Sequence, residues 1–394
     1  MLRVTSSLLL SLSLLATTAP TDEGPGVTVE ALDGTRTPRT VDGLELATMG
    51  PASALLSFAP GPAPAVPEGS FELRLLSGDR VRGEVVGGGE ERLDLRLVGG
   101  LFASFPLEEV SLVLALGDRD RLAQLAGPEA GDRAWRRTGG GFDPLDGFLL
   151  GFSPEGVLFE GELGERLIAW GELAALHVEA LEPLAEASGD ATPISVDLVD
   201  GSRLRGAFAG ISSGALALDR GGDKPLSIAL ELLVQVALDD PRLVFLGDLP
   251  FENLGPDGLF GDGFGLAWPP RVDRAVGGGP LRVDERTHAR GLGVHAPSRL
   301  AFDLTAGGVL RGAVGIDDSV LRLPAEGSVI FRLHHAGELL WESAELTSGS
   351  PAVELPAIEL SKAGRLELEV DAASDSIMGD RADWLDLRLV RPGV

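Results

Sequence analysis

An internal repeat constrains the fold of this chain more than any other feature. Residues 71–115, which open FELRLLSGDRVRG, align without a gap to residues 194–238, which open ISVDLVDGSRLRG, so that Gly78 matches Gly201. Apolar and polar residues alternate on both sides of these glycines, which is the period-two pattern of strands. A two-residue hairpin turn needs a positive φ that glycine adopts without penalty. A looser third copy spans residues 146–181, so the repeat predicts three similar β units.

Each copy contains a strand, a glycine hairpin, a bent second strand and further short strands. This order resembles an Sm-like or SH3-like small barrel, and we place two copies in residues 70–183 and the third in residues 192–240. Closing a sheet into a barrel protects its edges from pairing with other chains. The 54 glycines and 26 prolines favour many tight turns, and helical periodicity is weak. We therefore predict an all-β protein.

The N-terminus has the organisation of an export signal. Residues 1–19 carry Arg3, then a leucine-rich run, then small residues, which is the order of a secretory signal peptide. Residues 20–69 contain PGPAPAVPEG and are interpreted as a low-complexity linker, although a short paired segment before that stretch stays open. We expect a secreted, periplasmic or cell-surface protein without a membrane span once the signal is cleaved. A retained N-terminal anchor is the alternative.

Charge and cysteine content exclude several function classes. The formal net charge is −27, which argues against nucleic acid and anionic lipid as partners because both are bound chiefly by clustered Lys and Arg. There is no cysteine, so disulfides, thiolate metal sites and cysteine nucleophiles are ruled out. The fold must be stabilised by packing without covalent cross-links.

Five motifs stand out in residues 245–394. They are LGDLPF at 246–251, RGLGVHAPSRLAFDL at 290–304, VGIDD at 314–318, VIFRLHHAGELLWES at 329–343 and GDRADWLDLRLV at 379–390. In this order and spacing they resemble the NPCBM family, the novel putative carbohydrate-binding modules. The resemblance implies a jelly-roll β-sandwich, similar to galactose-binding-like domains, with sugar recognition as the expected activity.

Aromatic and polar residues in these motifs are candidates for a sugar site. A flat aromatic ring can stack on the apolar face of a sugar while nearby polar groups bond its hydroxyls. The candidates are Trp268, Arg290, His295, His335 and Trp384. Structural alternatives stay open: His295 could be a hydrogen-bonded structural residue, and Trp384 could pack at the start of the strand WLDLRLV. Trp268, in the proline-flanked LAWPPR loop, is the favoured exposed platform.

Four acidic residues are candidates for a structural calcium site, because sandwiches that this domain resembles commonly carry one. They are Asp248, Asp317, Asp318 and Asp380. A calcium ion needs about six to eight oxygen ligands. Among 60 acidic residues, chance proximity is the alternative.

No catalytic arrangement is recognisable. The chain lacks the alternating strand and helix pattern of a (β/α)8 barrel, and no G-x-S-x-G, H-E-x-x-H or phosphate loop occurs in a fitting context. We therefore expect a non-enzymatic carbohydrate-binding protein with glycans as partners. The alternative is a structural or assembly protein of the cell envelope, in which the barrel units bind proteins or self-associate.

Overall fold

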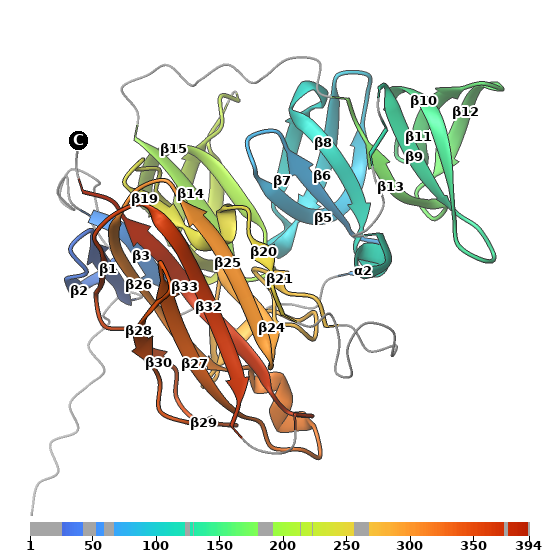
Figure 1. Ribbon diagram of the computed structural model, residues 1–394. Coiled ribbons are helices and arrows are strands. Elements are labelled where there is room, and N and C mark those ends of the chain that lie inside the picture. The colour runs from blue at the N-terminus through green and yellow to red at the C-terminus, as the bar shows by residue number, and fades with distance from the viewer. Residues whose placement is uncertain are drawn as a thin grey trace, which may run out of the picture.

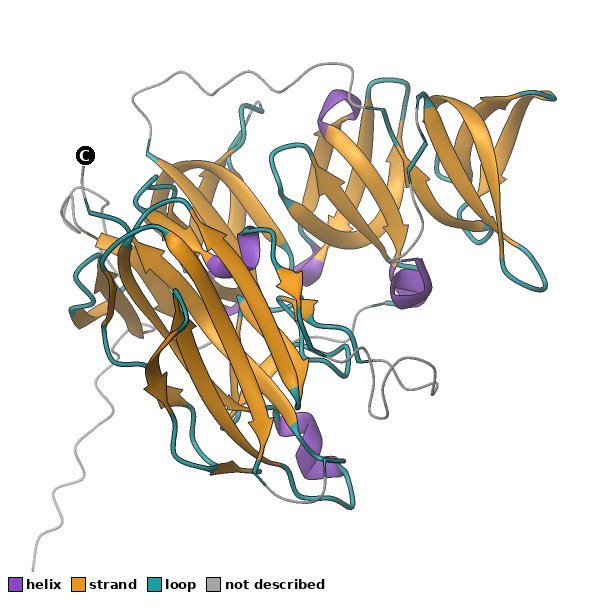
Figure 2. Cartoon of the chain, viewed as in Figure 1, coloured by secondary structure: helices purple, strands orange, loops and turns teal. Residues whose placement is uncertain are grey.

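The described part of the chain folds mainly into antiparallel strands (Figures 1 and 2). The computed structural model describes residues 26–41, 53–58, 67–122, 127–128, 130–179, 192–212, 214–222, 224–255, 268–373 and 377–392. Within these residues the α-helix is a single turn, α2 (Arg119–Leu122), and the other helical segments are short 3-10 turns. The all-β prediction is therefore confirmed. The signal peptide predicted at residues 1–19 lies outside the described residues.

Three similar five-stranded units lie between residues 71 and 238. Unit A contains β4 (Phe71–Leu75), β5 (Arg80–Gly88), β6 (Arg92–Leu97), β7 (Phe102–Pro106) and β8 (Val110–Ala115). Unit B contains β9 (Asp132–Arg137), β10 (Phe142–Phe152), β11 (Gly156–Gly161), β12 (Gly164–Ala169) and β13 (Leu173–His177). Unit C contains β14 (Pro193–Leu198), β15 (Arg203–Ser212), β16 (Ala215–Asp219), β17 (Leu226–Ala229) and β18 (Leu233–Leu238). Unit B begins earlier than the repeat in the sequence indicates, because β9 precedes residue 146.

The sequence repeat corresponds to equal local geometry. In each unit the first strand pairs with both the second and the last strand. The long second strand contains a bulge at the same place, between Val85 and Gly87 in unit A and between Phe208 and Gly210 in unit C. A bulge bends its strand, so one strand can serve two sides of a small unit. The turn glycines Gly78 and Gly201 both have φ of 83°, as the hairpin argument requires.

The paired segment left open before PGPAPAVPEG is present, so the linker expected at residues 20–69 does not extend over its whole length. This segment contains β1 (Gly26–Ala31), β2 (Arg36–Thr40) and β3 (Ser53–Phe58). Strand β3 pairs with β18 of unit C, in the same position in which β13 of unit B pairs with β8 of unit A. Because Val27 and Leu56 bury their side chains in the core shared by the three units, this segment is part of the fold.

The C-terminal third is a β-sandwich, drawn in orange and red in Figure 1. One sheet contains β19 (Leu243–Phe245), β21 (Arg271–Val272), β24 (Gly291–His295), β26 (Gly308–Ile316), β30 (Val353–Glu354), β31 (Ile358–Leu360) and β33 (Arg381–Val390). The other contains β20 (Glu252–Asn253), β25 (Ser298–Leu304), β27 (Ser328–His335), β28 (Glu338–Glu342), β29 (Leu346–Thr347) and β32 (Gly364–Ala372). Alternate residues of both sheets form its apolar core.

A small hairpin covers part of the outer face of the first sheet. It consists of β22 (Leu281–Val283) and β23 (Arg286–His288). Leu281 and Val283 pack there against Leu385 of β33, in a cluster separate from the main core of the sandwich. This sheet therefore has both of its faces buried around β33.

Candidate functional site

Two stacked aromatic rings lie at one end of the sandwich. The indole of Trp268 stacks on the imidazole of His295, with ring centroids 4.0 Å apart and an interplanar angle of 13°. His295 ends β24 and is buried, whereas Trp268 is partly exposed. Pairing of His295 with Arg381 of β33 fixes the backbone beneath the stack. The stack therefore brings an aromatic ring to the surface on a rigid support.

The imidazole of His295 is held in one neutral form. Burial is the largest effect, and together with the nearby Arg381 it lowers the pKa of His295. Its Nδ1 lies 2.8 Å from the carbonyl oxygen of Ala296, and a carbonyl can only accept, so Nδ1 carries the proton and donates it. Nε2 is then an acceptor, and it has no hydrogen-bond partner among the described residues. The atom is itself buried, so only a group that reaches into this end of the sandwich could donate to it.

A cationic side chain lies beside the stack. Arg381 donates from Nη1 to the hydroxyl of Ser319 at 3.0 Å. Gly277 makes room for this guanidinium, because a Cβ at that glycine would lie 2.9 Å from Nη1 of Arg381. The end of the sandwich therefore offers an aromatic face, a neutral acceptor and a guanidinium donor. That combination suits a polar ligand with an apolar face.

Arg290, predicted as a sugar contact, instead joins the sandwich to unit C. Its Nε donates to Asp197 at 2.9 Å and its Nη2 donates to the hydroxyl of Ser195 at 2.7 Å. The guanidinium carbon lies 3.9 Å from the centre of the Phe245 ring, and the residue is only 3% exposed. Unit C covers this end of β24, so Arg290 does not face solvent, and the expected role is wrong.

Trp384 and His335 are also misplaced for a sugar site that contains Trp268. Trp384 is fully buried and meets the ring of Phe331 edge to face, so the packing alternative holds for this residue. His335 is buried at the far end of β27. The other end of β27 begins at Ser328, whose backbone N–H donates to the side chain of Asp380. The carbonyl of Asp380 accepts from the N–H of Ala296, the residue after His295, so the start of β27 lies near the stacked pair. Seven residues of strand, or about 23 Å, therefore separate His335 from the stacked pair.

The four acidic residues proposed for calcium do not come together. Asp317 accepts from the backbone N–H groups of Arg282 and Ser319, and Asp318 from those of residues 284 and 285. Asp380 accepts from the N–H of Ser328. Asp248 pairs with Arg203 and Arg290. In the described part of the chain no three His, Asp or Glu side chains are grouped so that they could hold a metal ion. These carboxylates hold loops by accepting backbone hydrogen bonds, or form ion pairs at the contact with unit C.

Asp383 is a buried acid that the sequence analysis did not single out. It lies on β33 beneath the β22–β23 hairpin, and no described group forms a standard hydrogen bond with its carboxylate oxygens. Burial, reinforced by the neighbouring Asp317, raises the pKa of Asp383 well above its ordinary value. The protonated carboxyl can donate to the Asp317 carboxylate. In the sequence Asp383 is only one more polar residue in an alternating strand.

Comparison with known proteins identifies the sandwich. The family model described as NPCBM/NEW2 domain matches residues 244–390, which confirms the resemblance seen in the five motifs. A 122-residue stretch is 34% identical to alpha-1,3-galactosidase B of Akkermansia muciniphila and covers 30% of this chain and 15% of that protein.

Two solved structures from Clostridium perfringens are similar to parts of the chain. One holds CBM51-2, in complex with GlcNAc, and INT domains of ZmpB; it shares 24% identity at a TM-score of 0.34, over 45% of this chain and 36% of that one. The other is the CBM51 of GH95 in complex with methyl-galactose; it shares 19% identity at a TM-score of 0.30, over 37% of this chain and 99% of that one. The chain thus spans well under half of the galactosidase and of the ZmpB chain.

Proposed function

We propose that this protein is an exported, non-catalytic carbohydrate-binding protein whose NPCBM/NEW2 sandwich binds a sugar at Trp268 and His295. The observation that carries the proposal is the partly exposed indole of Trp268, stacked at 4.0 Å on a buried imidazole in a domain that matches a carbohydrate-binding family. Export rests on the signal-like residues 1–19. Among the described residues no helix is long and apolar enough to cross a membrane.

Each group at this end of the sandwich has a distinct task in the proposed complex. The indole of Trp268 packs against the apolar face of the sugar ring. Nε2 of His295 accepts from one hydroxyl, and the guanidinium of Arg381 donates to a second oxygen. Because His295 is neutral, it adds no positive charge beside the guanidinium of Arg381. Glycans that contain galactose are the first to test, since the Akkermansia relative is named a galactosidase.

A second candidate function is assembly through unit B. Phe148, Leu158 and Leu167 lie on neighbouring strands β10, β11 and β12, and their exposed fractions are 61%, 38% and 52%. Leu158 pairs directly with Leu167 across β11 and β12. Exposed apolar clusters of this kind mark protein contacts. This surface favours a protein partner for the barrel units alongside sugar binding by the sandwich.

A glycan array with the full chain tests the proposal, with and without calcium, because a structural calcium in the sandwich is a prediction of the family resemblance. Trp268→Ala should weaken binding at least about tenfold, since the stacking surface is lost. Trp341→Ala is the matched control, because Trp341 is a partly buried tryptophan of the same sandwich outside the stack. Circular dichroism confirms that each variant is folded.

Two outcomes would overturn the proposal. If the folded protein binds no glycan, carbohydrate binding is refuted and assembly becomes the leading function. If Trp268→Ala binds as tightly as the parent while Trp341→Ala does not, the sugar lies elsewhere on the sandwich.

A further inference from the structure

Units A and C contact each other through equivalent residues of their repeat. The backbone N–H of Arg82 donates to the side chain of Ser202 at 2.9 Å, and the N–H of Arg205 donates to the side chain of Asp79 at the same distance. In the alignment Arg82 matches Arg205 and Asp79 matches Ser202. Arg80 and Arg203 also match, and their backbones pair with each other where β5 meets β15. The two units are therefore related by an approximate two-fold axis.

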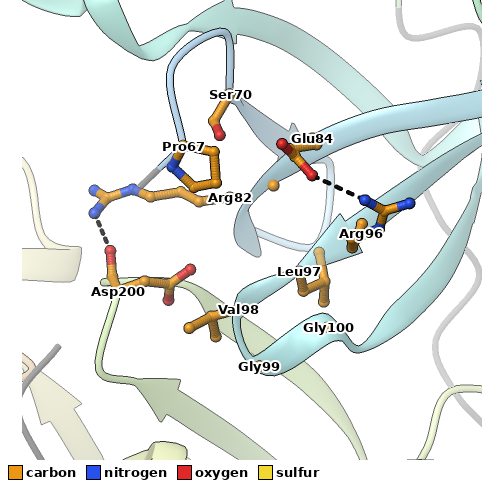
Figure 3. A pocket seen from close by; sticks show the side chains of 11 residues that line it. Pro67, Ser70, Arg82, Glu84, Arg96, Leu97, Val98, Gly99, Gly100 and Asp200 are labelled. Carbon is orange, nitrogen blue, oxygen red and sulfur yellow. Dashed lines mark hydrogen bonds and ion pairs between the residues drawn. The ribbon is translucent and has the colours of Figure 1, made fainter. Parts of the chain in front are cut away.

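A cavity of about 190 Å³ lies on one side of this axis (Figure 3). Its walls come from the chain before β4, from β5 and β6, from the turn that follows β6, and from the hairpin of unit C that contains Asp200. Arg82 and Asp200 lie at one side of the cavity, and the ion pair of Glu84 and Arg96 lies at the other. Leu97 contributes an apolar surface between them. Two units of the repeat thus build the cavity together.

Two polar groups that line this cavity lack partners. The hydroxyl of Ser70 forms no hydrogen bond with any described residue, although Ser70 is only 2% exposed. Nη2 of Arg82 has no hydrogen-bond partner in the described chain either, whereas its Nε donates to Glu72 and its Nη1 donates to the carbonyl of Asp200. Buried polar groups are normally hydrogen-bonded. Both groups therefore keep an unused hydrogen-bonding capacity beside the cavity.

The repeat itself supplies a comparison, because its two copies differ at a position that lines the cavity. Leu97 of unit A matches Arg220 of unit C. Arg220 reaches across the contact, lies 4.8 Å from the centre of the Phe105 ring and pairs with Glu109 at 3.2 Å. The shorter Leu97 has no such reach. At this position of the cavity wall, unit A therefore has a short apolar side chain where unit C has a long cationic one.

The size and charge of the cavity limit its ligand. A volume of about 190 Å³ far exceeds the roughly 10–15 Å³ that one water needs and falls short of the roughly 300–1,000 Å³ of sites for drug-sized ligands. The lining contains two arginines, Arg82 and Arg96, and two acids, Glu84 and Asp200, so its formal charges cancel. A charged ligand would disturb this balance in a partly desolvated place.

We propose that this cavity is a second ligand site, which binds one neutral, hydroxyl-bearing ring such as a single sugar unit. The apolar face of the ring packs on Leu97, and ring oxygens accept from Nη2 of Arg82 and bond with the hydroxyl of Ser70. The site shares no residue with the Trp268 surface and does not rest on the function proposed for the sandwich.

Saturation-transfer NMR on the full chain tests the second site, with free galactose, glucose and N-acetylglucosamine as probes. All measurements use a Trp268→Ala background, which removes the sandwich site. In this background at least one sugar should bind saturably. Leu97→Arg, which introduces the side chain of the equivalent position, should abolish that binding. Ser70→Ala should weaken it about fivefold, because one hydrogen bond is lost.

Ser227→Ala, an exposed serine on β17, is the matched control and should bind as the background does. Ser70→Ala removes only an unpartnered hydroxyl, so it tests the site even if Leu97→Arg fails to fold. No saturable sugar binding in the Trp268→Ala background, or binding unchanged in Ser70→Ala, would overturn the proposal. Binding of acetate in place of the sugars would also overturn it, since the ligand would then be anionic. Failure of the sandwich site would instead appear in the glycan array as binding that does not depend on Trp268.

Discussion

Removal of the Arg290 side chain should destabilise the whole protein and leave the intrinsic sugar affinity unchanged. Arg290 donates to Asp197, which is 2% exposed and keeps only Arg203, at 2.6 Å, as an ion partner in the described chain once Arg290 is gone. Breaking a buried ion pair by removing one partner costs about 3–5 kcal/mol, because the other charge stays buried. The hydroxyl of Ser195 also loses its partner, and the ring of Phe245 loses the guanidinium above it.

Urea unfolding followed by tryptophan fluorescence measures this loss for Arg290→Ala. Arg290→Met retains most of the aliphatic volume, so the difference between the two variants separates packing from charge. The matched control is Arg299→Ala, because the side chain of Arg299 is 47% exposed in its pair with Glu367, and such pairs contribute about 0–1 kcal/mol. If Arg290→Ala loses no more stability than Arg299→Ala, the contact between unit C and the sandwich does not stabilise the fold as described here.

Two further predictions concern the pH dependence of stability, measured as the free energy of unfolding of each variant and of the parent. Burial and the adjacent Asp317 raise the pKa of Asp383. The folded state therefore keeps a proton that the unfolded chain releases above about pH 3.8. As pH rises from there toward the raised pKa, the free energy of unfolding falls by about 1.4 kcal/mol per pH unit. Asp383→Asn should remove this slope, and parallel pH profiles of variant and parent would contradict the argument. Burial alone would raise the pKa of Glu72, but Arg119 and Arg82 beside it lower the pKa from 4.5 to about 2. The Glu72 carboxylate therefore stabilises the fold above pH 4.5, and this contribution is lost as pH falls to about 2. Glu72→Gln should remove about 3 kcal/mol of acid-sensitive stability, and an unchanged difference between pH 6 and pH 2 would refute the assignment.

The parts of the fold that were predicted from the sequence depend on local chemistry. Gly78 and Gly201 mark hairpins because their positive φ is a property of the turn itself. The alignment of units A and C also matches their bulges and their short 3-10 turns, which are Leu107–Glu109 in unit A and Leu230–Leu232 in unit C. Alternation around these points then indicates strands without any knowledge of tertiary structure.

The parts that were missed depend on contacts between distant segments. Strand β3 is short, and it is stabilised by pairing with β18, about 180 residues later. The sequence makes Arg290 a candidate sugar contact because polar groups beside an aromatic ring can bond sugar hydroxyls. Nothing in the motif shows that unit C covers it. Asp383 was missed because the hairpin that buries it lies about 100 residues earlier in the chain.

The motif RGLGVHA links the two contacts of the sandwich that matter most for the proposed function. Arg290, at its start, is fixed by Asp197 of unit C, and His295, five residues later, supports Trp268. Between them β24 pairs with β33 at every residue from Gly291 to His295, so the segment is a strand of about 17 Å held within a sheet. A strand that is paired along its whole length keeps a constant distance between its two ends. The position of the proposed sugar surface relative to the contact with unit C is therefore set by the pairing of β24 with β33.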